Sequence, residues 1–303
     1  MSDAAQGEPR QHEVFSTPFK VEPKYESWKT PGSYRSSPGG EQLGDTIKVW
    51  RVQDSGKRFG SVVSPSFGFE DSPDAEILTA GYNDGKEYGA VGVGRHGNFL
   101  QWGFSAVPSK MTDAGRSFFL NCVCYIRKFD GKPPLVTIKS DARLNVLNLA
   151  MVAPRITDKE FVARFFSPEI LAECKNDPAL LAGYCRKNIE LIYRDKSFRV
   201  DRDLAALGFA SNRKLETLEK LIGMMADPQK APAAEAMLKR YTVEDFQTPD
   251  QWRNWFEKNR GRIYFSDVGG YKFLVVPEGY LSAKKGGRAA AATAPAAEAT
   301  GQK

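Results

Sequence analysis

The apolar residues between Asp45 and Phe104 fall into short runs that are separated by turn residues. The runs are rich in β-branched and aromatic side chains, as β-strands are. Five runs share this pattern: TIKVWRV, GSVVS, EILTAGY, GAVGVG and NFLQWGF. Between the last two, Gly94-Arg95-His96-Gly97-Asn98 contains glycines that tolerate positive φ, which predicts a hairpin loop.

After Met111 the apolar residues recur every three to four positions. In residues 112–129 they define one helical face, Thr112 can cap the first turn, and two basic residues suit the last. We therefore predict a helix that packs on the sheet. The next segments, PLVTIK and RLNVLNLAMVA, are compatible with an edge strand followed by a helix or a second strand.

From Thr157 the pattern is helical and contains several signals for helix starts. Residues 157–160 and 248–251 have capping-box spacing, and Ser167-Pro168 and Asp177-Pro178 combine a cap with a proline in the first turn. Near the end, RIYFSDVGGYKFLVV alternates on both sides of a Gly-Gly turn, which predicts a β-hairpin.

These patterns predict an α/β or α+β fold with two modules. Residues 45–155 are expected to form a β-rich module with a packed helix, and residues 156–281 a mainly helical module closed by a β-hairpin. Residues 1–44 are rich in Pro, Gly, Ser and charge, which indicates an extended arm. Residues 282–303 are rich in Ala, Thr and Pro, which indicates a disordered tail.

Composition narrows the class of protein. The chain has 303 residues, is 41% hydrophobic and carries a net charge of +6, part of it in the tail. The remaining basic excess is too small to favour nucleic-acid binding. No run approaches the roughly 20 apolar residues of a membrane span, and MSDAAQGEPRQHEVF lacks the regions of a signal peptide. We expect a soluble cytoplasmic protein, although a misassigned start codon would hide an export signal.

Cysteine and histidine spacing gives no sign of a metal or a cofactor. The four cysteines are scattered and lack C-x-x-C spacing; they are Cys122, Cys124, Cys174 and Cys185. Neither a disulfide framework nor a zinc site is expected from them. The glycines of GAVGVG precede a predicted strand, so no helix N-terminus follows that could hold a dinucleotide.

His96 is the candidate catalytic residue. A histidine base needs a carboxylate that orients it and a nucleophile that it deprotonates, and Asp71 and Asp74 are among the upstream acids that could come near. No serine or cysteine lies in a G-x-S-x-G-type elbow. The alternative is that Arg95 and His96 are exposed residues at the tip of a hairpin.

Two further groups are candidate binding residues. The acidic run FEDSPDAE, which contains Asp71 and Asp74, could chelate a divalent cation, but it lacks the spacing of a calcium loop and is also compatible with a hydrated loop. Tyr82, Phe99 and Trp102 could form an aromatic platform for a sugar or a proline-rich peptide. They could equally well be cross-strand packing.

The segment from Tyr88 to Phe129 resembles the closing element of class I glutamine amidotransferase-like domains, including the ThuA-like branch. That family has a G-(R/K)-x-G turn, a second strand ending in G-F/H, and a helix with an F-x-N-A-like run. Here these read VGVGRHGN, FLQWGFS and GRSFFLNCVCYI. At the place where that family has a His and a Glu, this chain has Ser105–Pro108, which contains neither, and no cysteine lies upstream of it. The resemblance thus implies a remodelled module without the amidotransferase triad, in a family whose ThuA-like branch is associated with sugar metabolism. The helical remainder resembles uncharacterised bacterial proteins.

Taken together, the sequence favours a non-catalytic binding or interaction protein. Its partner would be a small molecule, such as a carbohydrate, or another protein. The predicted binding residues come from the hairpin, the acidic run and the aromatic group described above; they are Asp71, Asp74, Tyr82, Arg95, His96 and Trp102. The rival hypothesis is an enzyme that acts on a carbohydrate or a related small molecule, with His96 in its site. A weaker third hypothesis is that the basic tail binds an anion or a nucleic acid.

Overall fold

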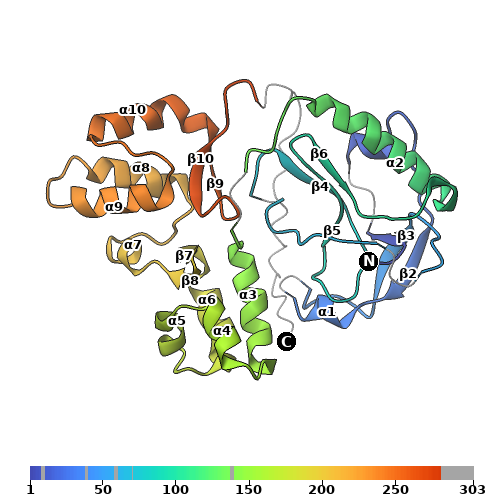
Figure 1. Cartoon of the computed structure of the whole chain (residues 1–303), viewed down its shortest axis with the longest axis horizontal. Coiled ribbons are helices and arrows are strands. Elements are labelled where there is room, and N and C mark those ends of the chain that lie inside the picture. Colours follow the sequence, from blue (N-terminus) through green and yellow to red (C-terminus); the bar gives the residue numbers. More distant parts are fainter. Residues whose placement is uncertain (8–10, 38–39, 58–60, 70, 137–139, 281–303) are drawn as a thin grey trace, which may run out of the picture.

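The computed structural model describes residues 1–7, 11–37, 40–57, 61–69, 71–136 and 140–280. Figure 1 shows two lobes: strands β1 to β6 and helix α2 form one, and the helices from α3 onward with two hairpins form the other. The predicted combination of a β-rich part, a helical part and a closing hairpin is confirmed. The predicted tail at residues 282–303 lies outside the described residues.

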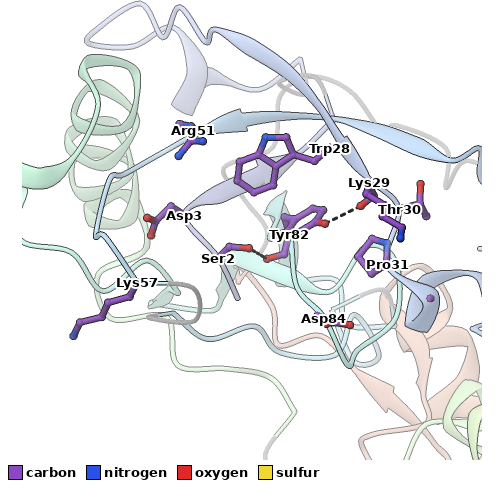
Figure 2. Close-up of a pocket in the computed structure, with 11 residues that line it drawn as sticks. Ser2, Asp3, Trp28, Lys29, Thr30, Pro31, Arg51, Lys57, Tyr82 and Asp84 are labelled. Carbon is purple, nitrogen blue, oxygen red and sulfur yellow. Dashed lines mark hydrogen bonds between the residues drawn. The ribbon is translucent and has the colours of Figure 1, made fainter.

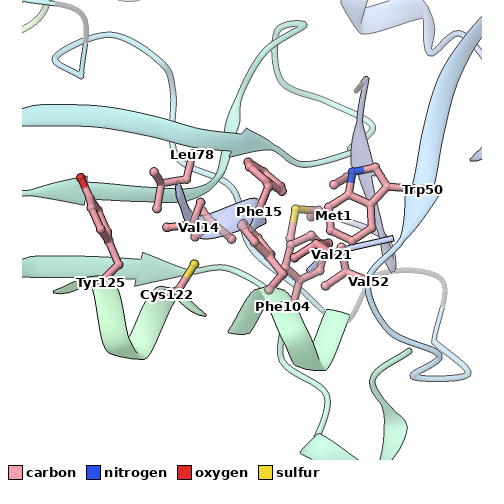
Figure 3. Packing of buried hydrophobic residues seen from close by; sticks show 13 residues of the cluster. Met1, Val14, Phe15, Val21, Trp50, Val52, Leu78, Phe104, Cys122 and Tyr125 are labelled. Atoms are coloured by element: carbon pink, nitrogen blue, oxygen red, sulfur yellow. The ribbon is translucent and has the colours of Figure 1, made fainter. Parts of the chain in front are cut away.

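Two three-stranded antiparallel sheets form the first module. One has the order β1 (Ala4–Gln6), β3 (Thr46–Arg51), β2 (Tyr25–Lys29), and the other β4 (Ala75–Ala80), β5 (Val91–His96), β6 (Phe99–Trp102). An isolated bridge between Ala5 and Gly81 joins them. Helix α2 (Asp113–Ile126) contributes Cys122 to a core with Phe15, Trp50 and Leu78 (Figure 3).

The described residues among 1–44 belong to this module rather than to a separate arm. Strands β1 and β2 lie on either side of β3, so that Ala5 and Tyr25 both pair with Trp50. The short helix α1 (Gly32–Arg35) buries Tyr34 in a smaller apolar cluster. Pairing with a distant strand overrides the local composition, because β3 supplies the hydrogen bonds that β1 and β2 cannot make alone.

The hairpin between β5 and β6 is tighter than the sequence predicts. Strand β5 continues through His96, which pairs with Phe99, so the turn is limited to Gly97 and Asn98. A Cβ atom on Gly97, whose φ is +55°, would lie 2.6 Å from the backbone nitrogen of Pro134. The predicted strand GSVVS is wrong, since its described residues form only an isolated bridge from Ser64 to Val91.

The second module contains eight α-helices and two hairpins within the described residues. The helices are α3 (Arg143–Val152), α4 (Lys159–Phe165), α5 (Pro168–Glu173), α6 (Pro178–Lys187), α7 (Arg202–Ala206), α8 (Leu215–Met224), α9 (Ala231–Tyr241) and α10 (Pro249–Asn259). The hairpins are β7 (Ile192–Asp195) with β8 (Ser197–Val200), and β9 (Ile263–Ser266) with β10 (Lys272–Val275). The hairpin of β7 and β8 was not predicted from the sequence. The hairpin of β9 and β10 was predicted and is confirmed.

Most predicted helix starts are confirmed. Ser167 and Asp177 cap α5 and α6 with proline in the first turn, and Thr248 forms a capping box with Gln251 in α10. Helix α4 differs, because its N-terminal cap is Asp158 rather than Thr157.

The segment RLNVLNLAMVA forms helix α3, and it belongs to the second module. Its Val146 and Leu147 share a core with Phe166 and Phe198. The change from one module to the other therefore falls before Arg143 rather than at residue 155. The Arg143 guanidinium forms a buried ion pair with Asp267, at 2.7 Å, which attaches α3 to the turn after β9.

Candidate functional site

An open pocket with a volume of about 540 Å³ lies on the first module. Its size is within the range of small-molecule sites in proteins. It is formed by the first residues of the chain, strand β2 with the segment that follows it, the end of β3, and the segment after β4 (Figure 2). The lining residues are Ser2, Asp3, Trp28, Lys29, Thr30, Pro31, Gly32, Arg51, Lys57, Tyr82 and Asp84.

Two aromatic side chains form the apolar part of this Trp28–Tyr82 pocket. Their ring centroids are 4.9 Å apart and their planes are inclined at 87°, so that the rings form a corner. The Arg51 guanidinium lies 5.2 Å from the Trp28 centroid. Both rings are only half-buried, which leaves aromatic surface available to a ligand.

Hydrogen bonds hold these side chains in place. Glu26 accepts from the Trp28 indole N–H and from Arg51 Nε, each at 2.7 Å. The same two contacts, that of Arg51 first, lower the pKa of Glu26. On the other ring, the Tyr82 hydroxyl donates to the Lys29 carbonyl at 2.7 Å. A pocket whose walls are fixed before binding loses less conformational entropy when a ligand enters.

Charged groups of both signs surround the aromatic corner. Lys29, Lys57 and Asp84 are exposed. Asp3 is buried, and its carboxylate accepts hydrogen bonds from the Gln53 amide at 2.6 Å and from the Ser55 backbone at 2.8 Å. Asp3 therefore shapes the wall, whereas the three exposed groups can contact a ligand.

His96 lies at the junction between the two modules and does not line this pocket. Its Nε2 atom is 3.5 Å from Oδ1 of Asp74, whose side chain is 1% exposed. Asp74 also accepts from the Ser72 hydroxyl at 2.5 Å, the Leu135 backbone at 2.9 Å and the Tyr280 hydroxyl at 3.2 Å. Burial opposes ionisation, but the contacts with His96 and Ser72 lower the pKa of Asp74 to about 2.

Arg95 is a core residue, so the hypothesis of an exposed tip is wrong for it. It is 3% exposed, and its Nε donates to Glu76 at 2.5 Å. Glu76 also accepts from the Tyr125 hydroxyl and lies 3.5 Å from His12 Nε2. Against the effect of burial, contacts with His12, Tyr125 and Arg95 lower the pKa of Glu76 to about 2.

Asp71 connects the modules rather than forming part of a hydrated loop. Its Oδ2 accepts from the backbone N–H groups of Asp267, at 2.6 Å, and Val268, at 3.3 Å. Burial, and then the charge of Asp267, raise the pKa of Asp71. Among the described residues, no group of three or more acidic, histidine or cysteine side chains could hold a metal ion. Glu70, in the same acidic run, lies outside the described residues.

The predicted aromatic platform does not assemble. Trp102 packs against Phe104, Phe118 and Phe119, with ring centroids 5.0 to 5.6 Å apart. Phe99 is 67% exposed on the edge strand β6. Only Tyr82 lines the pocket, where its partner is Trp28, which composition had assigned to an arm. The segment YESWK does not alternate between apolar and polar residues, because Tyr25 and Trp28 are three positions apart, so no local period marked it as a strand.

The four cysteines differ in burial, and none is bonded to another. Cys122 is buried and Cys124 is exposed, as their positions in the helix predict, and all four cysteines are free. Burial raises the pKa of the Cys185 thiol to about 12.

Within the described ranges, no helix has the length and apolar character needed to cross a membrane.

Comparison of the chain with protein-family models, curated proteins and solved structures finds no significant match.

Proposed function

We propose that this chain is a non-catalytic binding protein and that the Trp28–Tyr82 pocket is its ligand site. The observation that carries the proposal is the fixed aromatic corner with exposed polar groups around it. Trp28 and Tyr82 pack on one side against the apolar cluster of Tyr34 and Ile47, and both half-buried rings also line the pocket. Hydrogen bonds from the indole and from the hydroxyl hold the two rings in place.

The chemistry of the pocket favours a saccharide. The C–H faces of a sugar ring are apolar and weakly positive, so they pack against the negative face of an aromatic ring. Sugar hydroxyls both donate and accept hydrogen bonds, and this requires groups of both kinds around the ring. Lys29 as a donor and Asp84 as an acceptor supply them beside the aromatic corner.

The surroundings of the histidines support a non-catalytic role. In the part of the chain that the structure describes, no serine or cysteine side chain is hydrogen-bonded to His12 or His96. His96 contacts a carboxylate that is already occupied by three other donors, from Ser72, Leu135 and Tyr280. That arrangement connects segments of the chain and leaves the histidine without a nucleophile to activate.

Saccharide binding can be measured by isothermal titration calorimetry with cellotriose, maltotriose, galactotriose and trigalacturonate. We expect at least one of them to bind, and Trp28→Ala to weaken that binding at least tenfold. Phe99→Ala is the matched control, because Phe99 is an exposed strand aromatic outside the pocket. Circular dichroism and Trp28→Phe separate loss of the ring from loss of the fold. Absence of binding to all four sugars, or equal binding by Trp28→Ala, contradicts the proposal.

The rival function is an enzyme that uses His96. The contact between His96 and the buried Asp74 favours it, because a carboxylate of this kind orients a histidine base. A folded His96→Ala variant should then lose all turnover of a saccharide substrate while it keeps saccharide binding. Hydrolysis or oxidation of any of the four sugars by the wild-type chain, abolished in this variant, would replace the binding proposal.

A further inference from the structure

We infer that Glu26 is the positioning residue of the saccharide site, because its one carboxylate orients both Trp28 and Arg51. This inference rests on the proposed function and explains how the aromatic corner and the polar group beside it keep one orientation. Glu26 itself does not line the pocket. It therefore acts on a ligand only through the two side chains that it holds.

The register of β2 against β3 brings these three side chains together. In this antiparallel pair Glu26 lies opposite Val49, and Trp28 lies opposite Ile47. Side chains of alternate residues project from the same face of a sheet. Glu26 and Trp28 therefore share one face, and Arg51 reaches it from β3, two positions beyond the partner of Glu26. Diagonal neighbours on paired strands are within reach of long side chains, so the carboxylate lies between the guanidinium and the indole.

The two oxygens of the Glu26 carboxylate divide between these partners. Oε2 accepts from the Trp28 indole N–H and Oε1 accepts from Arg51 Nε, each at 2.7 Å. Arg51 Nη2 lies 3.5 Å from Oε2, so the guanidinium approaches the carboxylate side-on. The hydrogen bonds from Arg51, and then from Trp28, lower the pKa of Glu26. The carboxylate is therefore ionised near neutral pH, and hydrogen bonds to an ionised acceptor are stronger than those to a neutral one.

Neither partner has a second hydrogen bond that would keep its orientation. Within the described residues, Glu26 is the one acceptor of the Trp28 indole N–H, and every side-chain hydrogen bond of Arg51 goes to Glu26. The Arg51 side chain is 45% exposed and that of Glu26 39%, so packing alone does not fix this pair. Without the carboxylate, both partners gain freedom that ligand binding must then remove.

The ion pair of Glu26 and Arg51 also suits a neutral sugar. Glu26 compensates the charge of Arg51, which lines the pocket with its guanidinium 5.2 Å from the Trp28 centroid. Within the described residues, Nη1 of Arg51 has no hydrogen-bond partner. A sugar ring that packs on Trp28 carries hydroxyls at its rim, and Nη1 can donate to one of them. The orientation of the aromatic ring and that of the donor thus depend on the same carboxylate.

The test combines calorimetry with NMR on the whole chain. Glu26→Gln keeps the size of the side chain but replaces one accepting oxygen by a donor. It should weaken binding of the tightest-binding sugar among cellotriose, maltotriose and galactotriose roughly fivefold to thirtyfold, the effect of having to restrict two side chains. In proton–nitrogen correlation spectra each of the five tryptophans gives one indole N–H signal, and Trp28→Phe identifies that of Trp28. Glu26→Gln should move this signal upfield. Glu22→Gln is the matched control, because Glu22 also forms an ion pair, with Lys20, but lies outside the pocket.

The outcomes separate this inference from the proposed function. If Glu26→Gln binds the sugar as tightly as the wild type, or less tightly with the Trp28 signal unmoved, Glu26 does not position the site and the saccharide proposal stands. A wild-type Trp28 signal at the position of a solvent-exposed indole would also overturn the inference, whether or not the variant folds. So would binding of trigalacturonate with none of the three neutral sugars. If no sugar binds to the wild type, the proposed function is wrong, and this inference with it.

Discussion

Replacing Asp74 by Asn should destabilise the folded protein, and the loss should depend on pH in a defined way. Asp74 joins the two modules, because its buried carboxylate accepts from Ser72, from the connector residue Leu135 and from Tyr280, and also contacts His96. Asn keeps the shape of the side chain but replaces one accepting oxygen by a donor. An amide nitrogen in the Oδ2 position would face the Leu135 N–H, donor against donor, and in the Oδ1 position it would require Ser72 and His96 to accept instead of donate.

The magnitude follows from the pKa of Asp74, which is lowered from 3.8 to about 2. Each unit corresponds to about 1.4 kcal/mol, so the ionised carboxylate contributes about 2 kcal/mol to folding. A carboxyl group with a lowered pKa stabilises the fold above its unfolded-state value, and this stabilisation is lost as pH falls through the folded-state value. The difference between wild type and Asp74→Asn should thus be constant above about pH 5 and should shrink between pH 4 and pH 2.

Urea unfolding of both proteins at pH values from 2.5 to 7 measures this difference. Asp113→Asn is the matched control, because Asp113 is exposed in the first turn of α2. A difference below about 0.5 kcal/mol at pH 7, or one that does not change down to pH 2.5, would refute the reasoning, since the carboxylate would then contribute little as an ion.

Three further substitutions test the packing and the charges by the same unfolding measurement. Asp71→Asn should be neutral or stabilising at pH 7, because burial raises the pKa of Asp71 and ionisation therefore costs stability there; the gain should decline as pH falls toward 4. Gly115→Ala should cost about 1–3 kcal/mol or more, since its Cβ would lie 1.9 Å from the Val52 carbonyl oxygen. Arg143→Met should cost about 3–5 kcal/mol because it leaves Asp267 buried without its cation. A stabilised Arg143→Met or Gly115→Ala, or a clearly destabilised Asp71→Asn, would contradict these assignments.

Local patterns in the sequence were sufficient for the elements that carry their own signal. Helix α2 has a cap, an apolar face and a basic end, and strands β3 to β6 are short apolar runs between turns. The hairpin of β7 and β8 has no such signal. Its turn residue is Lys196, with φ of +59°, where glycine or asparagine would have marked it.

The candidate site was harder to predict because its residues come from segments that are distant in sequence. Trp28 and Tyr82 meet only because β2 and β1 pair with β3, and because β1 in turn bridges to Gly81. No local period contains that information. From the sequence, Asp71, Asp74 and Arg95 were candidate binding residues, but the sequence could not show that their partners are other parts of the chain. An ion-pair partner is set by tertiary packing.

The junction and the pocket lie at opposite ends of one strand. Asp74 directly precedes β4, and Tyr82 follows its last residue by two positions. A six-residue strand is about 20 Å long, so the two sites share a rigid element but no side chain. Substitutions at sites this far apart contribute independently to stability. Loss of ligand binding in a Trp28 variant and loss of stability in an Asp74 variant are therefore separate observables. A ligand that affected both would have to act by moving β4 itself.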